Sequence, residues 1–286
     1  MRAIEINQVS KKYKDTLALD HVQFKFEHGK IYGLLGRNGA GKSTLLNIIS
    51  NRIFASEGTI LIDGQDSKDN ELVHELIFCM SEADLYPNLK VRELMNWTEQ
   101  FYDCFDKQKA IVLCKHFGLD QNKKINALST GYKSIFKLIV ALSLQVPYVI
   151  FDEPVLGLDA NHREMFYKLL LEDFEKSQRT IIIATHLIEE VAGVIEDVVI
   201  IDQGKILLQD SVENLMSKGY SISGLQGDVD MYCQDKNVIG FDELGNMKIA
   251  YVLGELDERQ LNERLHPSSI NLQKLFVKLT ESGGTF

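Results

Sequence analysis

Residues 36–43 read GRNGAGKS, and most of the fold can be derived from this short stretch. It fits the pattern G-x-x-x-x-G-K-[ST], with the apolar segment YGLLG at its start and the run STLLNII at its end. An apolar strand before the loop and a helix after it allow backbone N–H groups and the helix N-terminus to surround an oligophosphate. A glycine-rich turn without a ligand is the alternative, but the flanking strand and helix favour a phosphate loop.

The loop predicts specific contacts to the phosphates and to a metal. Lys42 is expected to reach the β and γ phosphates, and the Ser43 hydroxyl is expected to bind Mg²⁺. The predicted phosphate contacts are Gly36, Arg37, Asn38, Gly39, Ala40, Gly41, Lys42, Ser43 and Thr44.

A second strand is expected to supply acidic groups to the same site. In YVIFDEP, four apolar residues lead into Asp152 and Glu153, so both acids follow a buried strand at its carboxyl end. Open α/β sheets bind their ligands at that end. We therefore expect Asp152 to hold Mg²⁺, largely through water, and Glu153 to polarise an attacking water molecule. Two acids at a strand end are common, so this prediction depends on the phosphate loop.

Composition excludes several other classes of protein. The chain has 286 residues and a formal net charge of −10, which argues against a surface that binds nucleic acid. Its four cysteines lack metal-site spacing and indicate free thiols in a reducing compartment. We expect no secretory signal in MRAIEINQVSKKYK and no segment that spans a membrane, because no apolar run approaches the roughly 20 residues required.

The order of strands and helices indicates an α/β fold with an inserted helical segment. Residues 1–35 alternate in strand fashion, and strands alternate with helices again after residue 147, which predicts βαβ units on a largely parallel sheet. Between them, from about 71 to 146, the pattern is mostly helical. We therefore predict a nucleotide-binding domain over 1–218 with that helical subdomain, and a small α+β domain over 219–286.

Residues 128–134, LSTGYKS, precede the apolar stripe Ile135, Leu138, Ile139 and Leu142. The stripe has helical spacing and is expected to pack in the core. Ser129 or Thr130 is the expected helix cap. From these residues alone, an ordinary helix start and a helix directed at an anion both remain open.

With its motifs taken together, the chain resembles the nucleotide-binding subunit of an ABC transporter, from about residue 2 to residue 215. The resemblance implies a P-loop NTPase fold with a mixed sheet and an inserted helical subdomain. The matching segments are Tyr13 in KKYKD for adenine stacking, GRNGAGKST as the Walker A loop, LSTGYKS as the signature, FDEP as the magnesium strand with the catalytic glutamate, Asp159 in VLGLD as the interface loop, and His186 in ATHLIEE as a contact to the γ phosphate.

The resemblance implies a function that needs ATP, Mg²⁺ and two protein partners. Ser129 and the N–H of Gly131 should contact ATP held by a second ATPase subunit, either identical or paralogous. A separately encoded membrane permease should hold the chain at the cytoplasmic face of the cell membrane. The segment 85–97 is the expected docking surface, although Tyr86, Leu89 and Trp97 could equally form local core.

The chain departs from the family pattern at three positions. Thr130 and Tyr132 replace the usual Gly and Gln of the signature, and Ser81 stands where a Gln normally contacts the metal. The shorter serine would need a water bridge, unless Glu82 fills the role. Slow or partner-dependent hydrolysis is one expected consequence.

Two further functions compete with a transport ATPase. They are a soluble ABC ATPase that acts on nucleic acid, and a nucleotide-dependent regulatory module without turnover.

The segments GYSISG and LQKLFVKLT of the extension are similar to the C-terminal part of ATPases from bacterial drug- and peptide-export systems. That similarity favours export of a drug or an amphipathic or antimicrobial peptide.

Overall fold

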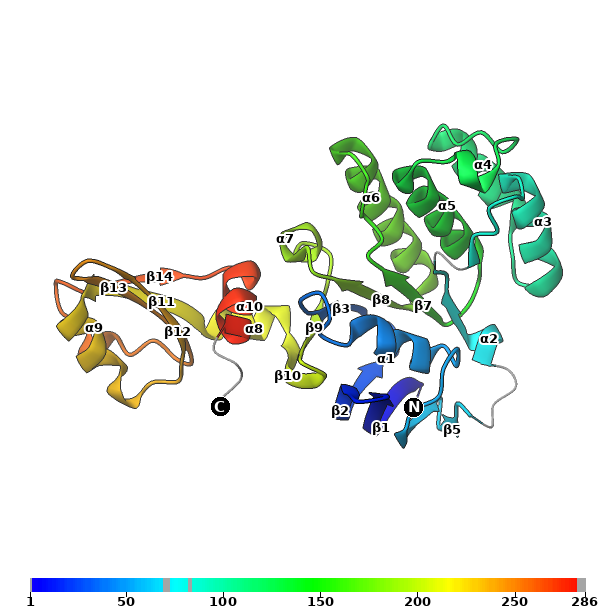
Figure 1. Cartoon of the computed structure of the whole chain (residues 1–286). Coiled ribbons are helices and arrows are strands. Elements are labelled where there is room, and N and C mark those ends of the chain that lie inside the picture. Colours follow the sequence, from blue (N-terminus) through cyan, green and yellow to red (C-terminus); the bar gives the residue numbers. More distant parts are fainter. Residues whose placement is uncertain (1, 69–72, 82–83, 282–286) are drawn as a thin grey trace.

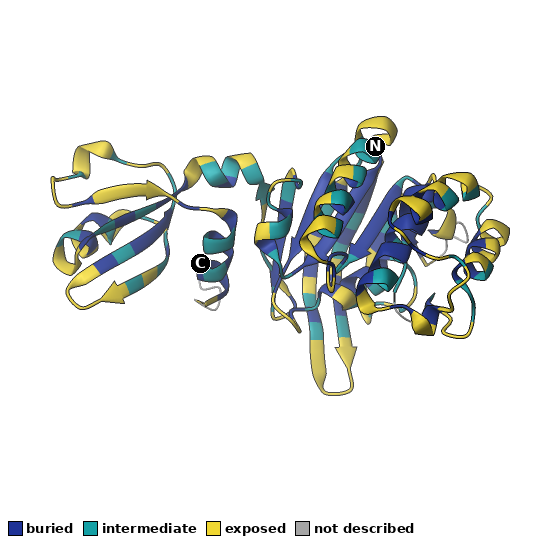
Figure 2. Cartoon of the chain, turned by 90° about the horizontal axis from the view of Figure 1, so that it is seen from above, coloured by how far each residue is buried: buried dark blue, intermediate teal, exposed yellow. Residues whose placement is uncertain are grey.

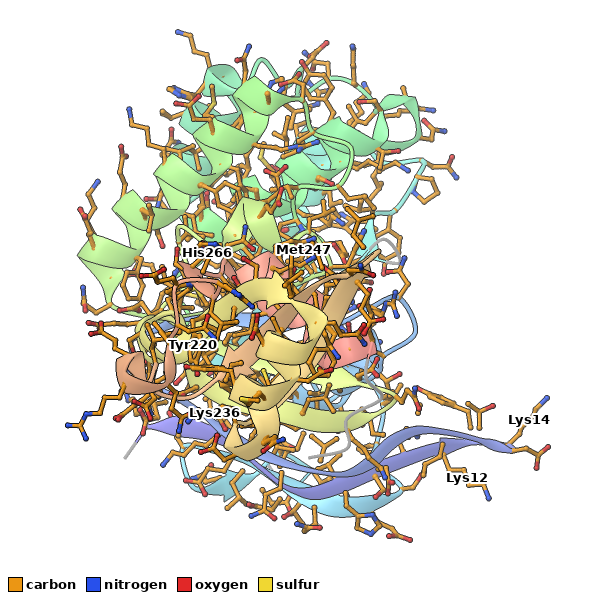
Figure 3. The ribbon with its side chains drawn as sticks, turned by 90° about the vertical axis from the view of Figure 1, so that its left-hand side faces the viewer. Lys12, Lys14, Tyr220, Lys236, Met247 and His266 are labelled. Atoms are coloured by element: carbon orange, nitrogen blue, oxygen red, sulfur yellow. The ribbon has the colours of Figure 1, made fainter. Side chains whose placement is uncertain are left out.

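The computed structural model describes residues 2–68, 73–81 and 84–281 (Figure 1). Its strands form three sheets. The first is antiparallel, with the order β2-β1-β4-β5. Its strands are β1 (Ala3–Tyr13), β2 (Thr16–Glu27), β4 (Glu57–Ile62) and β5 (Gln65–Asp66). The β1–β2 hairpin extends beyond the rest of the molecule, and Lys12 and Lys14 mark its exposed end (Figure 3).

The second sheet is the centre of the fold and has the order β10-β9-β3-β8-β7-β6. Five strands are parallel, and β10 is antiparallel to β9, so the expected mixed sheet is confirmed. The strands are β3 (Ile31–Leu35), β6 (Ile77–Cys79), β7 (Tyr148–Asp152), β8 (Thr180–Thr185), β9 (Asp197–Asp202) and β10 (Lys205–Ser211).

The central strand β8 shows how this sheet separates two apolar cores. Its sequence TIIIAT is buried throughout, because both faces of the sheet are covered (Figure 2). Side chains alternate along a strand, so Ile181 and Ile183 join the core beneath the helices, whereas Ile182 and Ala184 join the core shared with the first sheet. Helix α1 (Lys42–Ile49) contributes Leu45 and Ile49 to the latter core.

Helices cover the other face of the central sheet. They are α3 (Val91–Phe101), α4 (Lys107–His116), α5 (Thr130–Ser143), α6 (Ala160–Ser177) and α7 (Ile188–Val191), with a 3₁₀ turn at Ile125–Ala127. The short helix α2 (Val73–Leu76) instead packs into the core shared with the first sheet. The expected start of the helical subdomain, near residue 71, lies outside the described residues. Strand β6 lies within the expected helical range but pairs with β7, so the longer inserted helices begin only at Val91.

A third sheet, antiparallel with the order β12-β13-β11-β14, lies in the C-terminal extension. Helix α8 (Val212–Lys218) leads into this region, whose elements are β11 (Gly219–Leu225), α9 (Gln226–Tyr232), β12 (Val238–Leu244), β13 (Met247–Leu253), β14 (His266–Ser269) and α10 (Leu272–Glu281), with 3₁₀ turns at Cys233–Asp235 and Glu258–Gln260. Figure 1 shows this sheet at the opposite end of the molecule from α3 and α4.

Alternating residues of β13 join the extension to two cores. Ala250 and Val252 pack with β11 and α9, whereas Tyr251 belongs to the large core that also contains Leu275 and Leu279 of α10. Helix α10 lies beside α7 and α8, so it connects the extension to the body of the protein. We propose to treat 219–286 as an accessory domain anchored by this helix.

Candidate active site

The phosphate loop lies between β3 and α1, as the sequence predicted, and its geometry requires glycine. A side chain on Gly36 would place its Cβ 2.6 Å from the carbonyl oxygen of Ile201. Gly41 has φ +109°, and its Cβ would lie 2.8 Å from the carbonyl oxygen of Ala18. Gly39 has φ +82°, and a Cβ there would meet no atom within 4 Å. Close neighbours and positive φ angles together explain this glycine spacing.

Lys42 lies folded back over the loop that precedes it. Its Nζ donates to the carbonyl oxygens of Gly36 at 2.7 Å and of Arg37 at 3.3 Å, and its side chain is only 6% exposed. Burial lowers the pKa of the Lys42 ammonium, while the nearby carboxylates oppose that shift. The nearest of them is Glu153, whose Oε1 is 3.8 Å away. A buried cation therefore stands beside the acid at the end of β7.

Ser43 and Asp152 form a pair of oxygen ligands that suits Mg²⁺. The Ser43 hydroxyl donates to Asp152 Oδ2 at 2.9 Å, so two side chains that are 109 residues apart in sequence meet at one point. Asp152 Oδ1 is buried and has no hydrogen-bond partner in the described part of the chain. Burial also raises the pKa of this carboxyl group. An oxygen that lacks a partner beside a hydroxyl fits a divalent cation.

Glu153 is held by three donors at the end of β8. Thr185 Oγ1 donates to its Oε2 at 2.8 Å, and the backbone N–H of His186 donates to Oε1 at 3.2 Å. The Nδ1 of His186 lies 2.7 Å from the same Oε1. Glu153 itself has φ +48°, an uncommon angle for a residue with a side chain. The carboxylate is thus fixed in orientation close to Lys42, as a base for water requires.

These groups line a pocket of about 220 Å³ over the loop. The residues around it are Ala18, Arg37, Asn38, Gly39, Gly41, Lys42, Ser43, Thr44, Asp152 and Glu153. The structure therefore brings together most of the predicted loop contacts and both acids. Ala18 and the Thr185 hydroxyl were not predicted. The available signal for Thr185 was its position in ATH, directly before the predicted site residue His186.

Tyr13 lies outside that pocket lining. It is the last residue of β1, where it pairs with Thr16, and its side chain is about half exposed. The Nζ of Lys11 is 5.2 Å from the centre of its ring. The geometry therefore leaves adenine stacking by Tyr13 as a proposal, with one face of the ring next to a lysine.

The signature segment does not line the phosphate-loop pocket of its own chain. Ser129 is the N-cap of α5 and accepts from the backbone N–H of Tyr132 at 3.3 Å. Thr130 begins the helix without a positive φ angle, so its replacement of Gly causes no backbone strain there. Gly131 is buried, and a Cβ on it would lie 2.5 Å from the carbonyl oxygen of Gly157. Ser129 and Gly131 are not part of the pocket lining.

His162 connects the loop that contains Asp159 to helix α5. Asp159 is the N-cap of α6, and its carboxylate accepts from the His162 backbone N–H at 2.9 Å and lies 2.8 Å from its Nδ1. These bonds from His162 lower the pKa of Asp159. The ring of Tyr132 meets the His162 ring edge to face, with centroids 6.1 Å apart. The unusual Tyr132 is thus packed against the helix that follows the interface loop.

Ser81 takes part in a polar cluster rather than in the pocket. Its hydroxyl accepts from Arg52 Nη1 at 2.9 Å and donates to Asp84 Oδ2 at 3.0 Å. Arg52 also pairs with Asp84 at 2.7 Å. Glu82, the alternative to Ser81, lies outside the described residues. The structure therefore gives the Ser81 hydroxyl two polar partners, Arg52 just beyond the end of α1 and Asp84.

All four cysteines are free thiols, and no group of three or more potential metal-binding side chains occurs among the described residues. Within the same residues, none of the helices has the length and hydropathy needed to cross a bilayer.

Comparisons with known proteins agree with the motifs. A family model described as "ABC transporter" matches residues 19–156. The chain is 26% identical over 282 residues to the ABC transporter ATP-binding protein YtrB of Bacillus subtilis, covering 96% of this chain and 97% of that protein. It is 31% identical over 202 residues to the putative ABC transporter ATP-binding protein AlbC of the same species, covering 67% and 84%.

A solved structure gives the same result for the fold. The dimeric structure of a bacterial ABC transporter cassette is 25% identical in sequence, with a TM-score of 0.66, and the match covers 73% of this chain and 98% of that one. Some other relatives are named for uptake or import systems.

Proposed function

The chain belongs to the ABC transporter family of ATP-binding proteins, and on this basis we propose that it powers a separately encoded membrane permease. Cassettes of this family are ATPases with a P-loop fold, and ATP is their substrate. The observation that supports turnover in this chain is the position of Glu153 between Lys42 and His186. A regulatory module without turnover would have no need to orient a carboxylate there.

Each side chain of the site has a distinct role in this proposal. Lys42 neutralises charge on the β and γ phosphates, and the loop N–H groups bind their oxygens. Ser43 and Asp152 would hold Mg²⁺, which when bound would supply neutralisation of the phosphate charge. Glu153 orients and polarises the attacking water, and Thr185 and the His186 backbone keep its carboxylate in place. His186 contacts the γ phosphate.

A second ATPase subunit completes the site in this proposal. The N-terminus of α5 carries Ser129 and the N–H of Gly131, and neither lines the pocket of its own chain. A partner placed head to tail would direct this helix N-terminus at the phosphates, where its dipole favours negative charge. The partner is a second copy or a paralogue. The dimeric arrangement of the similar solved cassette supports this step.

The permease is proposed to dock on a groove beside α3. A cavity of about 420 Å³ lies there, and three aromatic side chains on its wall are exposed: Tyr86 by 53%, Trp97 by 41% and Phe101 by 73%. Exposed aromatic groups around a concave surface are typical of protein interfaces. Leu89, by contrast, is partly buried against the core. Docking would hold the chain at the cytoplasmic face of the cell membrane.

Export of a drug or an amphipathic peptide is the proposed direction of transport. The feature that favours it is the C-terminal extension, residues 219–286. Uptake is the competing direction, because some relatives are named for import systems. The cargo itself would be selected by the permease.

The experiment that tests the function joins the chain to the permease encoded beside it. Co-purification in detergent, followed by phosphate release in proteoliposomes, should show ATP turnover that needs both proteins. Cargo accumulation inside or outside vesicles of known orientation gives the direction. Absence of turnover with the permease present would support the regulatory alternative, and turnover stimulated by nucleic acid would support a soluble ABC ATPase.

A further inference from the structure

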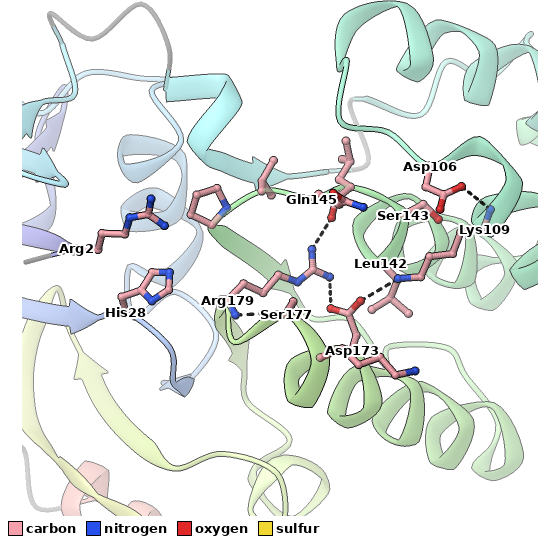
Figure 4. A pocket seen from close by; sticks show the side chains of 14 residues that line it. Arg2, His28, Asp106, Lys109, Leu142, Ser143, Gln145, Asp173, Ser177 and Arg179 are labelled. Carbon is pink, nitrogen blue, oxygen red and sulfur yellow. Dashed lines mark hydrogen bonds and ion pairs between the residues drawn. The ribbon is translucent and has the colours of Figure 1, made fainter.

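A second pocket lies on the side of the central sheet where β7 and β8 begin, away from the phosphate loop. Its volume is about 510 Å³, within the range of small-molecule sites in proteins. The wall combines segments that are far apart in sequence: the residues next to β1 and β2, the start of α4, the end of α5 and the end of α6. A ligand here would contact both the inserted helices and the body of the protein (Figure 4).

The pocket is basic in a chain that is strongly acidic overall. Four cationic side chains line it, and only two carboxylates do. The cations are Arg2, Lys109, Lys176 and Arg179. One of the carboxylates, Asp106, is already used as the N-cap of α4, where it accepts from the Lys109 backbone N–H at 2.9 Å. The charge therefore favours an anion, against the net charge of the whole chain.

Arg179 is the most deeply buried of these cations, with a side chain only 5% exposed. Its two terminal nitrogens donate to the carbonyl oxygens of Leu144 at 2.6 Å and of Ala141 at 3.2 Å, which end α5. Asp173 lies between Arg179 and Lys109, at 2.6 Å and 2.9 Å (Figure 4). Burial nevertheless leaves the pKa of Arg179 below its ordinary value, so its partners do not fully offset its desolvation.

Two donors in the pocket wall remain without a partner among the described residues. They are Arg179 Nε and the hydroxyl of Ser143, whose residue is 1% exposed. A buried polar group without a hydrogen bond is destabilising, and native proteins contain few of them. The carbonyl oxygens at the C-terminal end of α5 and the carboxylate of Asp173 bind the two terminal nitrogens of Arg179. These contacts do not involve Arg179 Nε or the Ser143 hydroxyl.

We propose that this pocket binds a small organic anion that carries two or more phosphate or carboxylate groups. One anionic group would accept from Arg179 Nε and the Ser143 hydroxyl, and a second would meet Lys176 and Arg2 at the mouth. Such a ligand would connect α4 and α5 to α6. The site is independent of ATP turnover, so its test does not depend on the proposed function.

The test measures binding without nucleotide, and the variants described below separate this pocket from the phosphate loop. Fructose 1,6-bisphosphate and citrate serve as the phosphate and carboxylate probes, each compared with NaCl at equal ionic strength. Calorimetric titration gives the Kd, and thermal unfolding gives the shift in Tm. At least one probe should bind the native chain and raise its Tm above the NaCl value.

Three variants locate the binding. Ser143→Ala removes one unpartnered hydroxyl, and Lys176→Ala removes one cation from the last turn of α6. Both should weaken the binding about tenfold, because each removes a contact to a charged group. Lys115→Ala is the matched control, since Lys115 is also exposed in the last turn of its helix, α4, and does not line the pocket.

The outcomes are decisive in each direction. Binding of neither probe beyond the effect of NaCl would overturn the proposal, as would equal affinity in Lys176→Ala and Lys115→Ala. Without ligand, Ser143→Ala should be as stable as the native chain or more so, because it removes an unpaired group. If that variant does not fold, the comparison of the two lysine variants still decides.

Discussion

The Nδ1 of His186 lies 2.7 Å from Oε1 of Glu153, and the His186 backbone N–H donates to the same oxygen at 3.2 Å. One residue therefore contacts the glutamate twice, through its ring and through its backbone. Such a double contact limits the rotation of the carboxylate. It also brings the histidine ring to the acid that is proposed to polarise water.

Glu153→Gln should keep ATP binding and stop hydrolysis. The amide keeps the shape of the side chain and can still accept from Thr185, but it cannot act as a base, so turnover should fall at least a hundredfold. ATP-bound subunits should then accumulate as a dimer, which size-exclusion chromatography with ATP and Mg²⁺ would detect. A variant that binds ATP but elutes only as a monomer would count against the proposed head-to-tail dimer.

Lys42→Ala should abolish ATP turnover. The ammonium is the buried cation of the loop and lies 3.8 Å from Glu153, so its loss removes charge neutralisation from the transition state. We expect a decrease of at least a hundredfold in steady-state phosphate release. Lys14→Ala, at the exposed end of the β1–β2 hairpin, is the control for loss of one positive charge (Figure 3). Native rates in the Lys42 variant would contradict the assignment of the loop.

The sequence was sufficient to predict those parts of the site that lie next to one another in the chain. The phosphate loop follows β3 directly, Asp152 ends β7 and Glu153 comes next, so the apolar runs and the glycine and acidic residues after them located these groups. Their proximity to Thr185 depends on the parallel pairing of β7 with β8, in which Asp152 lies opposite Ala184. A pattern within one segment carries no information about that register.

Short elements and contacts distant in sequence were the features that could not be predicted. Strand β6 has three residues, too few to show an alternating pattern, and it lies within a range that is mostly helical. Arg179 caps α5 from 35 residues away, and only the packed structure brings it there. The family, the fold and ATP binding are confirmed, whereas the roles of single site residues and of the extension stay predictions.

Gly131→Ala should prevent ATP-driven dimer formation while the monomer still binds ATP. The new Cβ would lie 2.5 Å from the Gly157 carbonyl oxygen, so the loop before α6 or the start of α5 must move. Neither Gly157 nor the start of α5 lines the loop pocket, so the affinity of the monomer for ATP should change less than threefold. The quantity to measure is the fraction of dimer that forms with ATP when Gly131→Ala is combined with Glu153→Gln.

Gly227→Ala is the matched control for that substitution. A Cβ on Gly227 meets no atom within 4 Å, and the residue lies in helix α9. Alanine is the better helix former by roughly 0.5–1 kcal/mol, so this variant should be equally or more stable and should dimerise normally. Dimers of undiminished affinity in Gly131→Ala would show that the signature helix tolerates displacement.

Ser81→Gln should raise the basal ATP turnover of the isolated subunit by a few-fold, equivalent to about 1 kcal/mol in the barrier. The longer amide could reach the metal site, whereas the serine hydroxyl is bonded to Arg52 and Asp84. Ser81→Ala removes those bonds without supplying an amide and is the control for local disturbance. If Ser81→Gln leaves ATP turnover unchanged and Glu82→Ala lowers it, the metal contact belongs to Glu82. If neither variant changes turnover, both assignments are wrong.

Asp242→Asn should destabilise the chain by about 1 kcal/mol at neutral pH. Hydrogen bonds from Lys274, Lys278 and Tyr251 lower the pKa of Asp242 well below its ordinary value of 3.8, and Lys278 is only 6% exposed. A lowered pKa in the folded state contributes stability above the ordinary pKa, and this contribution is lost as the pH falls toward the lowered value.

The difference in unfolding free energy between the native chain and the Asp242→Asn variant should therefore be constant from pH 5 to 8 and should decrease below about pH 4. Urea unfolding at each pH measures it. Glu263→Gln, which neutralises an exposed acid in the same extension, is the control and should change little at any pH.

Because Asp242 connects β12 and β13 to α10, loss of its charge should also loosen the extension first, which hydrogen exchange of the β13 amides would detect. Unchanged exchange in β13, together with a pH-independent difference, would show that this ion-pair cluster does not anchor the extension.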